Sequence, residues 1–562
     1  MGLARQGPAG LPSSLFIVIA LFFFLSFANA LSFPNQISLG HAAAKEREKD
    51  EEPASKTLHN LIGALHVMQD DYFQLWLGTW PTAIDWTAAV LNTHVAATLA
   101  SLTDTAHDIT PSFRAVENTI NHFFSHTSTF YFGENSFGLR QQAYDDMLWV
   151  VLDWLENIKF QDLHSDLHYT YETSSAMSTK SWYGTQFRDS AAHRARLFWE
   201  LASVGWDETL CGGGMVWSPH LGPYKNAITN ELYISASIGM YLYFPGDPIE
   251  SPFIASQSSG RDGFPHNPAH LKAAVDGYAW LKHSNMTGPL GLYGDGFHIS
   301  GWKSPSKPGT KKCDLLNTMA YTYNQGVVLS SLRGLWLATG DQDYLRDGHE
   351  LIYSVLRATG WPQTDSQQWA GLGRGGVLED VCDSRGACNQ DGQTFKGIFF
   401  HHLAEFCRPL RPQEERFLVG DATRRGAHTE KSPRDENYGK HLERCRSYGG
   451  WIEHNAKAAL MTRDDDGKFG AWWGRAYGAL GDSDALVDTS VLPAGAVDFR
   501  NTILYDHPPF SGVGAAAHST GATNKKDYND RGRGRTVETQ SSGVAVLRAL
   551  YQWQTCESLS HD

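Results

Sequence analysis

The chain has 562 residues, of which 47 are Lys or Arg and 61 are Asp or Glu, so its formal net charge is −14. Aromatic residues make up 12% of the chain and charged residues only 19%, a composition that excludes a mainly disordered protein. The negative charge argues against a nucleic-acid partner, because affinity for nucleic acid comes largely from neutralising phosphates. We therefore expect a globular protein with a large core and enough aromatic side chains to line a groove.

The first thirty residues have the pattern of a secretory signal peptide. Arg5 is the only charged residue, an apolar run covers residues 15–28, and Ala28-Asn29-Ala30 is a small-x-small cleavage site. The run is too short to span a membrane, and residues 551–562 lack the hydrophobic tail of a lipid-anchor signal. These patterns predict a protein without a transmembrane segment that is secreted, extracellular or associated with a cell wall.

After an irregular leader at residues 31–56, helix-length segments with a 3.6-residue apolar period follow one another to the end of the chain. They lie near 57–77, 82–102, 111–126, 139–159, 187–204, 225–243, 267–283, 317–338, 342–358, 395–407, 438–461, 484–497 and 536–554. About a dozen helices without a linker predict one all-α domain over 57–556, in which six hairpins could form an (α/α)₆ barrel; a helical solenoid also fits this count. Two polar segments, 421–437 and 514–535, interrupt the period and are interpreted as insertions.

Seven cysteines follow the signal peptide, and the odd number predicts that at least one is free or intermolecular in an oxidising compartment. Cys382 and Cys388 could close a small loop. No His-Glu-x-x-His or calcium-loop pattern occurs, so we expect neither a metal nor another cofactor. Asn285 lies in an N-glycosylation sequon. The sequence carries no signal for oligomeric state, which leaves a monomer as the default expectation.

The sharpest local feature is the pair Asp145-Asp146, which opens a strongly apolar helical segment. One interpretation is a helix start, where Asp is favoured in the cap and the first turn. The other is catalysis, because adjacent helical residues place their Cβ atoms roughly 5 Å apart, close to the spacing of the two carboxyl groups in retaining glycosidases. Both carboxyl groups could serve one bond only at a helix end or facing a cleft.

Polar and aromatic residues gather at four other junctions ahead of apolar segments. Residues 206–217 place three glycines between Trp206-Asp207 and Trp217, which suits either a connecting turn or a rim on which a sugar ring stacks. Asn226 and Asn230 lie one helical turn apart, as a ligand-facing wall or as satisfied buried amides. Residues 321–326 and 389–397 have the same character.

Taken together, these junctions resemble those of glycoside hydrolase family 76, the endo-α-1,6-mannanases, and most closely its secreted fungal members. The matching blocks appear in family order over residues 57–554: they are 80–90 (WPTAIDWTAAV), 144–146 (YDD), 206–217, 224–228 (YKNAI), 323–327 (YNQGV), 395–399 (FKGIF) and 533–540 (RGRTVETQ). Each block is modest by itself, whereas the ordered set is highly specific.

The resemblance implies an (α/α)₆ barrel that hydrolyses α-1,6-mannosidic bonds with retention of configuration. It implies that Asp145 is the nucleophile and Asp146 the acid/base. It also implies substrate contacts, some of which could instead hold the barrel together, at Tyr144, Trp206, Asp207, Trp217, Lys225, Asn226, Tyr323, Asn324 and Gln325.

The sequence thus predicts a secreted endo-acting α-1,6-mannosidase whose partner is mannan or its oligosaccharides. Some family relatives are lipid-anchored cell-wall enzymes that are thought to transfer glycans, so a transglycosidase acting on mannan-type glycans is an alternative within the same class. A non-catalytic mannan-binding protein on the same barrel is an alternative from another class. The two carboxylates argue against it, because a pure binder has no reason to place two repelling charges in its groove.

Overall fold

The computed structural model describes residues 53–105, 111–130, 142–169, 182–249, 263–417, 433–477, 491–501 and 527–558. Residues Thr57–Asp562 form one compact unit. The expected signal peptide and most of the leader lie outside the described residues. Among the residues that are described, no helix has both the length and the apolar character needed to cross a membrane.

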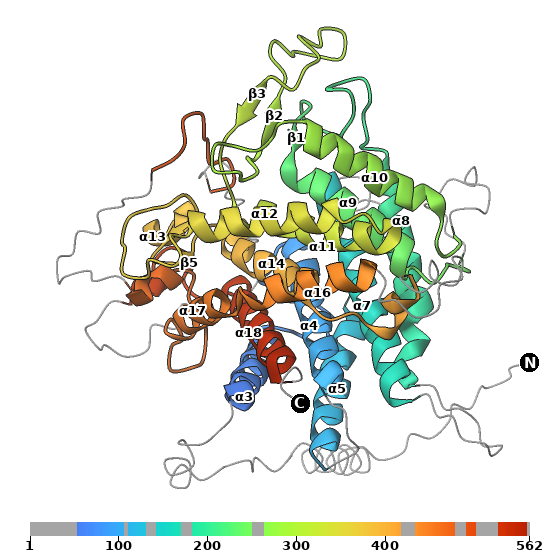
Figure 1. The fold of residues 1–562 in the computed structure, drawn as a ribbon, viewed down its shortest axis with the longest axis vertical. Helices are drawn as coiled ribbons and strands as arrows, with labels where there is room; N and C mark the ends of the chain where they lie inside the picture. The colour runs from blue at the N-terminus through green and yellow to red at the C-terminus, as the bar shows by residue number, and fades with distance from the viewer. Residues whose placement is uncertain are drawn as a thin grey trace, which may run out of the picture. The chain divides into compact units, whose positions relative to one another are not determined.

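Six helices form a closed inner ring, and each packs against the next (Figure 1). In order around the ring they are α4 (Asp85–Thr105), α7 (Tyr144–His168), α9 (Ala227–Tyr243), α11 (Thr322–Thr339), α14 (Gln390–Cys407) and α18 (Val537–Ser558). The ring is completed by contacts between α18 and α4. A closed ring of this kind excludes a solenoid, whose first and last repeats do not meet.

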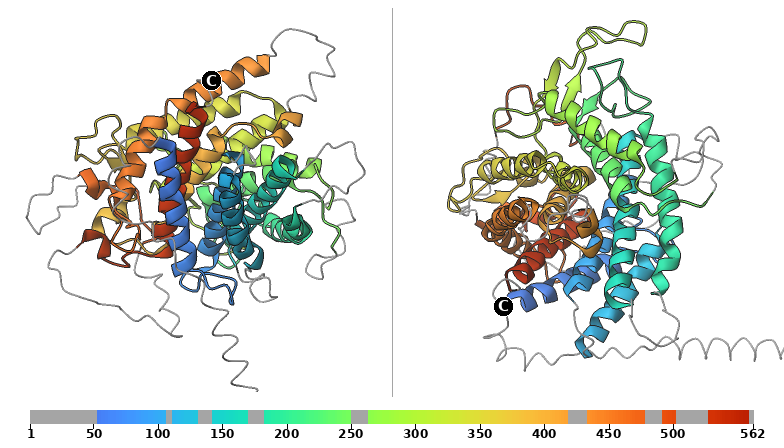
Figure 2. Two further views of the ribbon diagram at one scale, coloured as in Figure 1. Left: turned by 90° about the horizontal axis from the view of Figure 1, so that it is seen from below. Right: turned by 45° about the vertical axis from the view of Figure 1, so that its right-hand side comes forward.

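A second layer of helices covers the ring from outside. These helices are α3 (Pro53–His66), α5 (Pro111–Thr129), α8 (Arg188–Ser203), α10 (Pro268–His283), α12 (Asp343–Ala358), α16 (Pro433–Arg446) and α17 (Gly449–Leu460). Of these, α5 packs on α4, α8 on α7, α10 on α9, α12 on α11 and α17 on α18. Figure 2 shows α18, in red, beside α3, in blue. Outer helices separate the six inner helices along the chain, with two of them, α16 and α17, between α14 and α18. The expected (α/α)₆ barrel is confirmed.

The two layers differ in their sequences as their surroundings require. In the inner helix α9, all residues are buried except Tyr241 and Tyr243, and apolar residues occupy every side of the helix. The outer helix α12 is amphipathic and turns Leu345, Ile352 and Val355 toward the core. An apolar helix surrounded by protein and an amphipathic helix at the surface are the two forms expected for a ring and its cover.

Two small sheets lie at the starts of inner helices. Strands β1 (Lys225–Asn226), β2 (Gly296–His298) and β3 (Leu315–Asn317) form an antiparallel sheet in which Asn226 pairs with Gly296 and Gly296 with Asn317. Strands β4 (Gly373–Arg374) and β5 (Val377–Leu378) form a second antiparallel pair ahead of α13 (Val381–Arg385). Because β1 leads directly into α9 and β3 lies just before α11, the first sheet holds two helix N-termini together.

The predicted helices agree with the observed ones except in three places. The segment at 57–77 ends as a helix at His66, continues as a π turn over Val67–Asp71 and then becomes a loop. The segment at 438–461 is divided between α16 and α17. The helix expected at 484–497 is wrong where the structure describes it, since residues 491–497 have no regular structure.

The two polar insertions also differ from expectation where they are described. Residues 433–437 are the start of α16, and residues 527–535 contain the short 3-10 helix Tyr528–Asp530; the remainder of both segments lies outside the described residues. Three disulfides join Cys211 to Cys313, Cys382 to Cys388 and Cys407 to Cys445, and Cys556 belongs to none of them. The small loop between Cys382 and Cys388 and a seventh cysteine outside the intramolecular disulfides are therefore confirmed.

Candidate active site

The N-terminal turns of the inner helices meet at one end of the ring, where side-chain hydrogen bonds and stacked rings connect them. The Trp86 indole in α4 donates to Asp391 Oδ1 in α14 over 3.1 Å. The Tyr323 ring in α11 stacks on the Phe395 ring in α14, with centroids 3.9 Å apart. Gln390 in α14 donates to Glu538 in α18 over 2.9 Å. Residue blocks that are far apart in the sequence thus converge, because each marks the start of an inner helix.

Asp145 is the second residue of α7 and is 5% exposed. Its Oδ1 accepts the backbone N–H of Asp146 over 3.1 Å, and its Oδ2 accepts the Trp217 indole N–H over 3.0 Å. The Arg500 guanidinium lies 3.6 Å from the same Oδ2. Burial raises the pKa of Asp145 from 3.8 to about 6, and Arg500 and the hydrogen bonds limit that rise because they favour the charged form.

Asp146 is the next residue of the same helical turn and is partly exposed, whereas Asp145 faces inward. The two carboxyl groups therefore have different environments although they are neighbours in the chain. Both lie where the partial positive charge of the helix N-terminus favours an anion. The two carboxyl groups could act on one bond only if the pair lay at a helix end or faced a cleft, and in the structure the pair lies at the start of α7.

Trp217 is placed by the backbone around it. Its N–H donates to the Tyr224 carbonyl over 2.8 Å, and its carbonyl accepts the N–H of Tyr144 over 2.9 Å. A Cβ at Gly205 would lie 2.6 Å from the Tyr144 ring, so only glycine allows this close approach. Tyr144 is 8% exposed and packs into the wall of the site.

The glycine-rich turn at residues 211–214 packs against an indole of the protein itself. Gly214 has a φ of +91°, and a Cβ there would lie 2.5 Å from the Trp280 ring. The glycines are therefore needed for contact with Trp280, which is the connecting-turn interpretation. Trp206 is half-buried and stacks against Tyr233 with centroids 5.7 Å apart, and Asp207 accepts hydrogen bonds from Thr209.

Lys225 stabilises this turn by hydrogen bonds to its backbone carbonyls. Its ammonium group donates to the carbonyls of Asp207 at 2.6 Å, Leu210 at 2.8 Å and Gly214 at 3.0 Å, and also to that of Gly213. The side chain is 1% exposed, and burial lowers its pKa from 10.5 to about 8. This geometry favours a supporting role over direct contact with a substrate.

The expected amide residues divide into two groups. Asn230 is satisfied, since it accepts the Met215 N–H and donates to the Met215 and Asn226 carbonyls. Gln325 is also satisfied, by the backbone of Tyr293 and the carbonyl of Tyr321. These two side chains join segments of the wall to one another.

Three other polar groups at this end of the ring are buried without a hydrogen-bond partner among the described residues. They are both side-chain polar atoms of Asn226, both of Asn324 and the hydroxyl of Tyr323. Buried polar groups normally have a partner, and exceptions are frequent at functional sites. These three are therefore the strongest candidates among the expected wall residues for contact with water or a ligand.

Arg500 is a residue of this site that the sequence analysis did not select. It reaches Asp145 from the irregular segment 491–501, and its guanidinium lies over the Trp217 ring at 5.2 Å. No motif marks that segment in the sequence, and its apolar period predicted a helix up to residue 497 instead of a loop. Asp295 was missed for a similar reason, because it precedes a strand of only three residues.

Asp295 and Asp391 add two further carboxyl groups, of which Asp295 is buried and Asp391 is partly buried. Asp295 accepts hydrogen bonds from the Tyr224 hydroxyl at 2.5 Å and from Asn317 at 3.3 Å. Burial raises the pKa of both carboxyl groups, and Arg500 opposes that rise. Asp391 belongs to the junction at 389–397 that the sequence marked as polar, whereas Asp295 belongs to none.

A second acidic cluster lies at the start of α13, beside the wall. Lys396 donates to both oxygens of Asp383, at 2.8 and 2.6 Å, and Asp380 accepts the N–H and the hydroxyl of Thr322, the first residue of α11. Burial raises the pKa of Asp380 to about 7 and that of Glu379 to about 7. These contacts connect α11 to α14 through the segment before and within α13. Lys396, which lies in the sequence block 395–399, therefore supports the wall of the site and does not face the aspartate pair.

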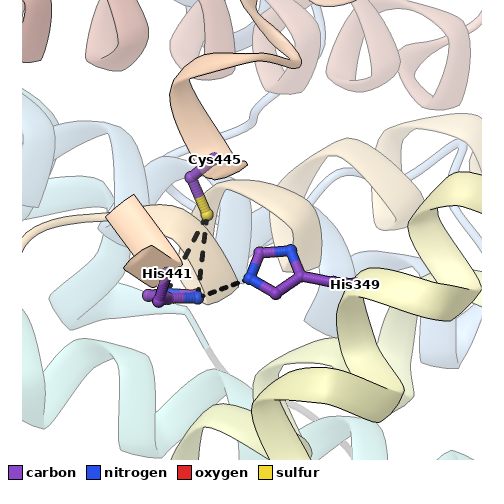
Figure 3. Close-up of side chains that lie close together, drawn as sticks. All are labelled: His349, His441 and Cys445. Atoms are coloured by element: carbon purple, nitrogen blue, oxygen red, sulfur yellow. Dashed lines mark hydrogen bonds between the residues drawn. The ribbon is translucent and has the colours of Figure 1, made fainter. Parts of the chain in front are cut away.

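Among the described residues, two groups of side chains have ligand atoms close enough for a metal ion, and both contain disulfide cysteines. His349, His441 and Cys445 form one group (Figure 3), but Cys445 is bonded to Cys407 and has no thiolate to offer. His349 Nε2 instead lies 2.9 Å from His441 Nδ1, and His349 Nδ1 lies 2.7 Å from the Tyr448 hydroxyl. This is a hydrogen-bonded chain between helices. The other group contains Cys382 and Cys388, which are bonded to each other.

The chain is similar to several known proteins. The chain is 22% identical over 364 residues to the mannan endo-1,6-alpha-mannosidase DCW1 of Candida glabrata, an alignment that covers 61% of this chain and 64% of that protein. The match thus spans slightly less than two thirds of the relative's length.

Among solved structures, the chain is similar to the GH76A alpha-1,6-mannanase of Salegentibacter sp. HEL1_6, with 17% identity, a TM-score of 0.47 and coverage of 88% of this chain and 98% of that one. It is also similar to Dfg5 of Chaetomium thermophilum, with 14% identity, a TM-score of 0.48 and coverage of 89% of each chain. The family model described as glycosyl hydrolase family 76 matches residues 175–439. The part of the chain that this model matches, slightly less than half, is similar to glycosyl hydrolase family 76.

Proposed function

We propose that this protein is a retaining endo-α-1,6-mannosidase in which Asp145 is the nucleophile and Asp146 the acid/base. The observation that carries the proposal is the pair of adjacent carboxyl groups at the N-terminus of α7, one buried among donors and the other open to solvent. The α-1,6 linkage of mannan is suggested by the similarity to the mannan endo-1,6-alpha-mannosidase DCW1 of Candida glabrata.

The environment of Asp145 suits a nucleophile. A nucleophilic carboxylate must be ionised, and three groups favour that form: the Asp146 N–H, the Trp217 indole N–H and the Arg500 guanidinium. The hydrogen bonds also fix the direction in which the carboxylate points. A pKa of about 6 leaves Asp145 mostly ionised at neutral pH.

The position of Asp146 suits an acid/base, which must exchange protons with solvent between the two steps. In the first step, the Asp145 carboxylate attacks the anomeric carbon while Asp146 donates a proton to the leaving glycosidic oxygen. A mannosyl ester of Asp145 results. In the second step, Asp146 takes a proton from water as the water oxygen attacks the same carbon, which releases Asp145 and regenerates the protonated Asp146.

The aromatic residues around the pair provide surfaces for sugar rings. Trp86, Trp206 and Trp217 are partly exposed, and an indole face packs well against the C–H face of a pyranose. Asn226, Tyr323 and Asn324 have unpaired polar atoms that could bind hydroxyl groups. Four other residues of the site support it without contacting the substrate in this proposal, because they keep neighbouring residues in place: Tyr144, Asp207, Lys225 and Gln325.

The same proposal covers the remainder of the chain. Residues 1–30 direct secretion, residues 57–556 form one catalytic domain, and the protein acts outside the cell or at a cell wall. Asn285 carries an N-linked glycan in this account, since its side chain is exposed in a turn after α10.

The test is the release of oligosaccharides from linear α-1,6-mannan, with product lengths resolved by chromatography. Wild type should release a range of short oligosaccharides, and D145N and D146N should each lose at least about 10³-fold in kcat/KM. The matched control is D465N/D466N, which removes an adjacent, exposed aspartate pair in the turn that follows α17. Its rate should equal that of wild type.

Three outcomes would overturn parts of the proposal. Binding of mannan without product at any pH would favour a non-catalytic binding protein. Products longer than the starting oligosaccharide would favour a transglycosidase, because a sugar hydroxyl can replace water in the second step. Release of mannose alone would contradict endo action.

A further inference from the structure

We propose that Arg500 is the positioning residue of the aspartate pair: it is the fixed counter-charge shared by Asp145, Asp295 and Asp391, and it keeps Asp145 ionised. The inference rests on the proposed function for its catalytic meaning, but the charge arrangement can be tested independently. The contact between Arg500 Nη2 and Asp145 Oδ2, at 3.6 Å, is the starting observation.

The three carboxyl groups come from three separate parts of the barrel. Asp145 belongs to α7, Asp391 to α14, and Asp295 precedes β2. Asp145 and Asp295 are buried, Asp391 is partly buried, and each of the three is stabilised in its charged form by Arg500. Burying several carboxylates near one another is costly unless a cation is among them, and Arg500 is the cation that all three share.

Other titratable groups also face Asp145. Asp146 follows it in α7, and the Tyr323 hydroxyl approaches from α11. Tyr224 and Asp498 face the neighbouring Asp295, and Arg533 faces Asp391. Among these groups only Arg500 brings a positive charge to Asp145, so its loss should change the charge state of Asp145 more than the loss of any other.

Arg500 is held in place from both sides. Val497 exchanges two hydrogen bonds with the side chain of Asn317 in β3, at 2.8 and 2.9 Å. The Tyr321 hydroxyl donates to Asp498 over 2.7 Å and lies 3.3 Å from the Arg500 N–H. On the other side, the Arg500 carbonyl accepts from the Asn389 amide, next to α14.

Arg500 also orients the other donor to Asp145. Its guanidinium lies over the Trp217 ring at 5.2 Å, and the same indole donates its N–H to Asp145 Oδ2. A cation over an indole face is attracted to it, so Arg500 favours the ring orientation that this hydrogen bond requires. Arg500 thus acts on Asp145 through its charge and through Trp217.

The experiment compares wild type, R500M and R500K in two measurements over pH 4 to 9: kcat/KM on α-1,6-mannooligosaccharides and the melting temperature. Methionine removes the charge but keeps much of the side-chain length. We expect the acid limb of the R500M profile to move by one pH unit or more toward higher pH, because Asp145 then holds its proton more strongly. R500K should recover at least half of that shift.

The melting temperature gives a readout that does not depend on activity. R500M should lose several degrees against wild type near pH 7.5, where Asp145 is ionised, and much less near pH 4.5, where Asp145 is mostly protonated. The control R346M removes an exposed arginine of α12 that pairs with Asp343 and should change neither profile.

The outcomes separate this inference from the proposed function. An active wild type whose acid limb is unchanged in R500M would overturn the inference and leave the function intact. An inactive wild type with the pH-dependent loss of melting temperature in R500M would overturn the function and support the charge arrangement. An equal loss of melting temperature at both pH values would mean that Arg500 is only structural, which contradicts the inference.

Discussion

At the scale of single residues, the site depends on the carboxyl group of Asp145. Burial makes its ionisation unfavourable, while its hydrogen-bond donors and Arg500 favour the ionised form. Asp145 is 5% exposed, and its two oxygens accept hydrogen bonds from Asp146 and Trp217. Burial raises its pKa to about 6, more than its partners lower it. A charged group that the fold tolerates at a cost is typical of an active site, and it should reduce the stability of the folded protein.

The first prediction concerns D145N and pH. Because the pKa of Asp145 is higher in the folded protein than in the unfolded chain, folding favours its protonated form, and its ionisation between about pH 4 and pH 6 lowers the free energy of unfolding. Asparagine does not ionise, so D145N should be more stable than wild type above pH 6, by up to about 3 kcal/mol. Near pH 4 the two proteins should be close to equal.

Urea unfolding at pH 4.2 and pH 7.5 measures this difference. D465N/D466N is the control, since its carboxylates are exposed at the surface. A D145N protein that is no more stable than wild type at pH 7.5 would show that Asp145 does not carry an unfavourable charge in the folded state.

At the scale of elements, the structure explains what the sequence could and could not predict. The inner and outer helices were predictable, because apolar side chains continue over 16 or more residues, on one face of α12 and on every side of α9. The position of the Asp145-Asp146 pair at a helix start was predictable because the pair comes directly before such an apolar run. Strands of two or three residues such as β1 and β3 have no period to detect, and their pairing depends on contacts distant in sequence.

Arg500 was not predictable for the same reason. Its segment is held by Asn317, Tyr321 and Asn389, which are 111 to 180 residues away in the sequence. Lys225 was predictable as a functional position but not in its role. Its sequence context is that of a polar wall, whereas its acceptors are backbone carbonyls of a turn that only the fold brings near.

The second prediction distinguishes the two roles for Lys225. K225M removes the donor that four carbonyls of this turn share, so the free energy of unfolding should fall by about 2–4 kcal/mol. Chemical denaturation followed by tryptophan fluorescence measures the loss. The exposed Lys312, near the same turn, provides the control K312M, which should have wild-type stability. Wild-type stability of K225M together with a raised KM would show instead that Lys225 contacts the substrate.

At the scale of the whole molecule, closure of the ring connects the two ends of the described chain. Arg548 in α18 is 1% exposed and donates to the Ala97 carbonyl of α4 at 3.2 Å, the His401 carbonyl of α14 at 3.2 Å and Glu405 at 3.3 Å. One side chain of the last inner helix thus reaches the first and the fifth. Because the aspartate pair lies at the end of this ring, its geometry depends on closure.

The third prediction concerns that closure. R548M should lower the free energy of unfolding by about 3–5 kcal/mol, because it leaves a buried carboxylate and two carbonyls with fewer partners. Unfolding should remain one transition when followed by circular dichroism and by fluorescence, with both midpoints lowered equally. R446M, at an exposed position of α16, is the control. Midpoints that separate in R548M would show that the hairpins unfold independently.

The central claim is that Asp145 and Asp146 perform a double displacement on an α-mannosidic bond. Proton NMR of the first product, recorded within minutes of adding enzyme to an α-1,6-mannooligosaccharide, tests it most directly. We predict that the new reducing end appears first as the α-anomer and only later equilibrates with the β-anomer, and that neither signal appears with D145N. Initial formation of the β-anomer would mean a single displacement and would contradict the role of Asp145 as the nucleophile.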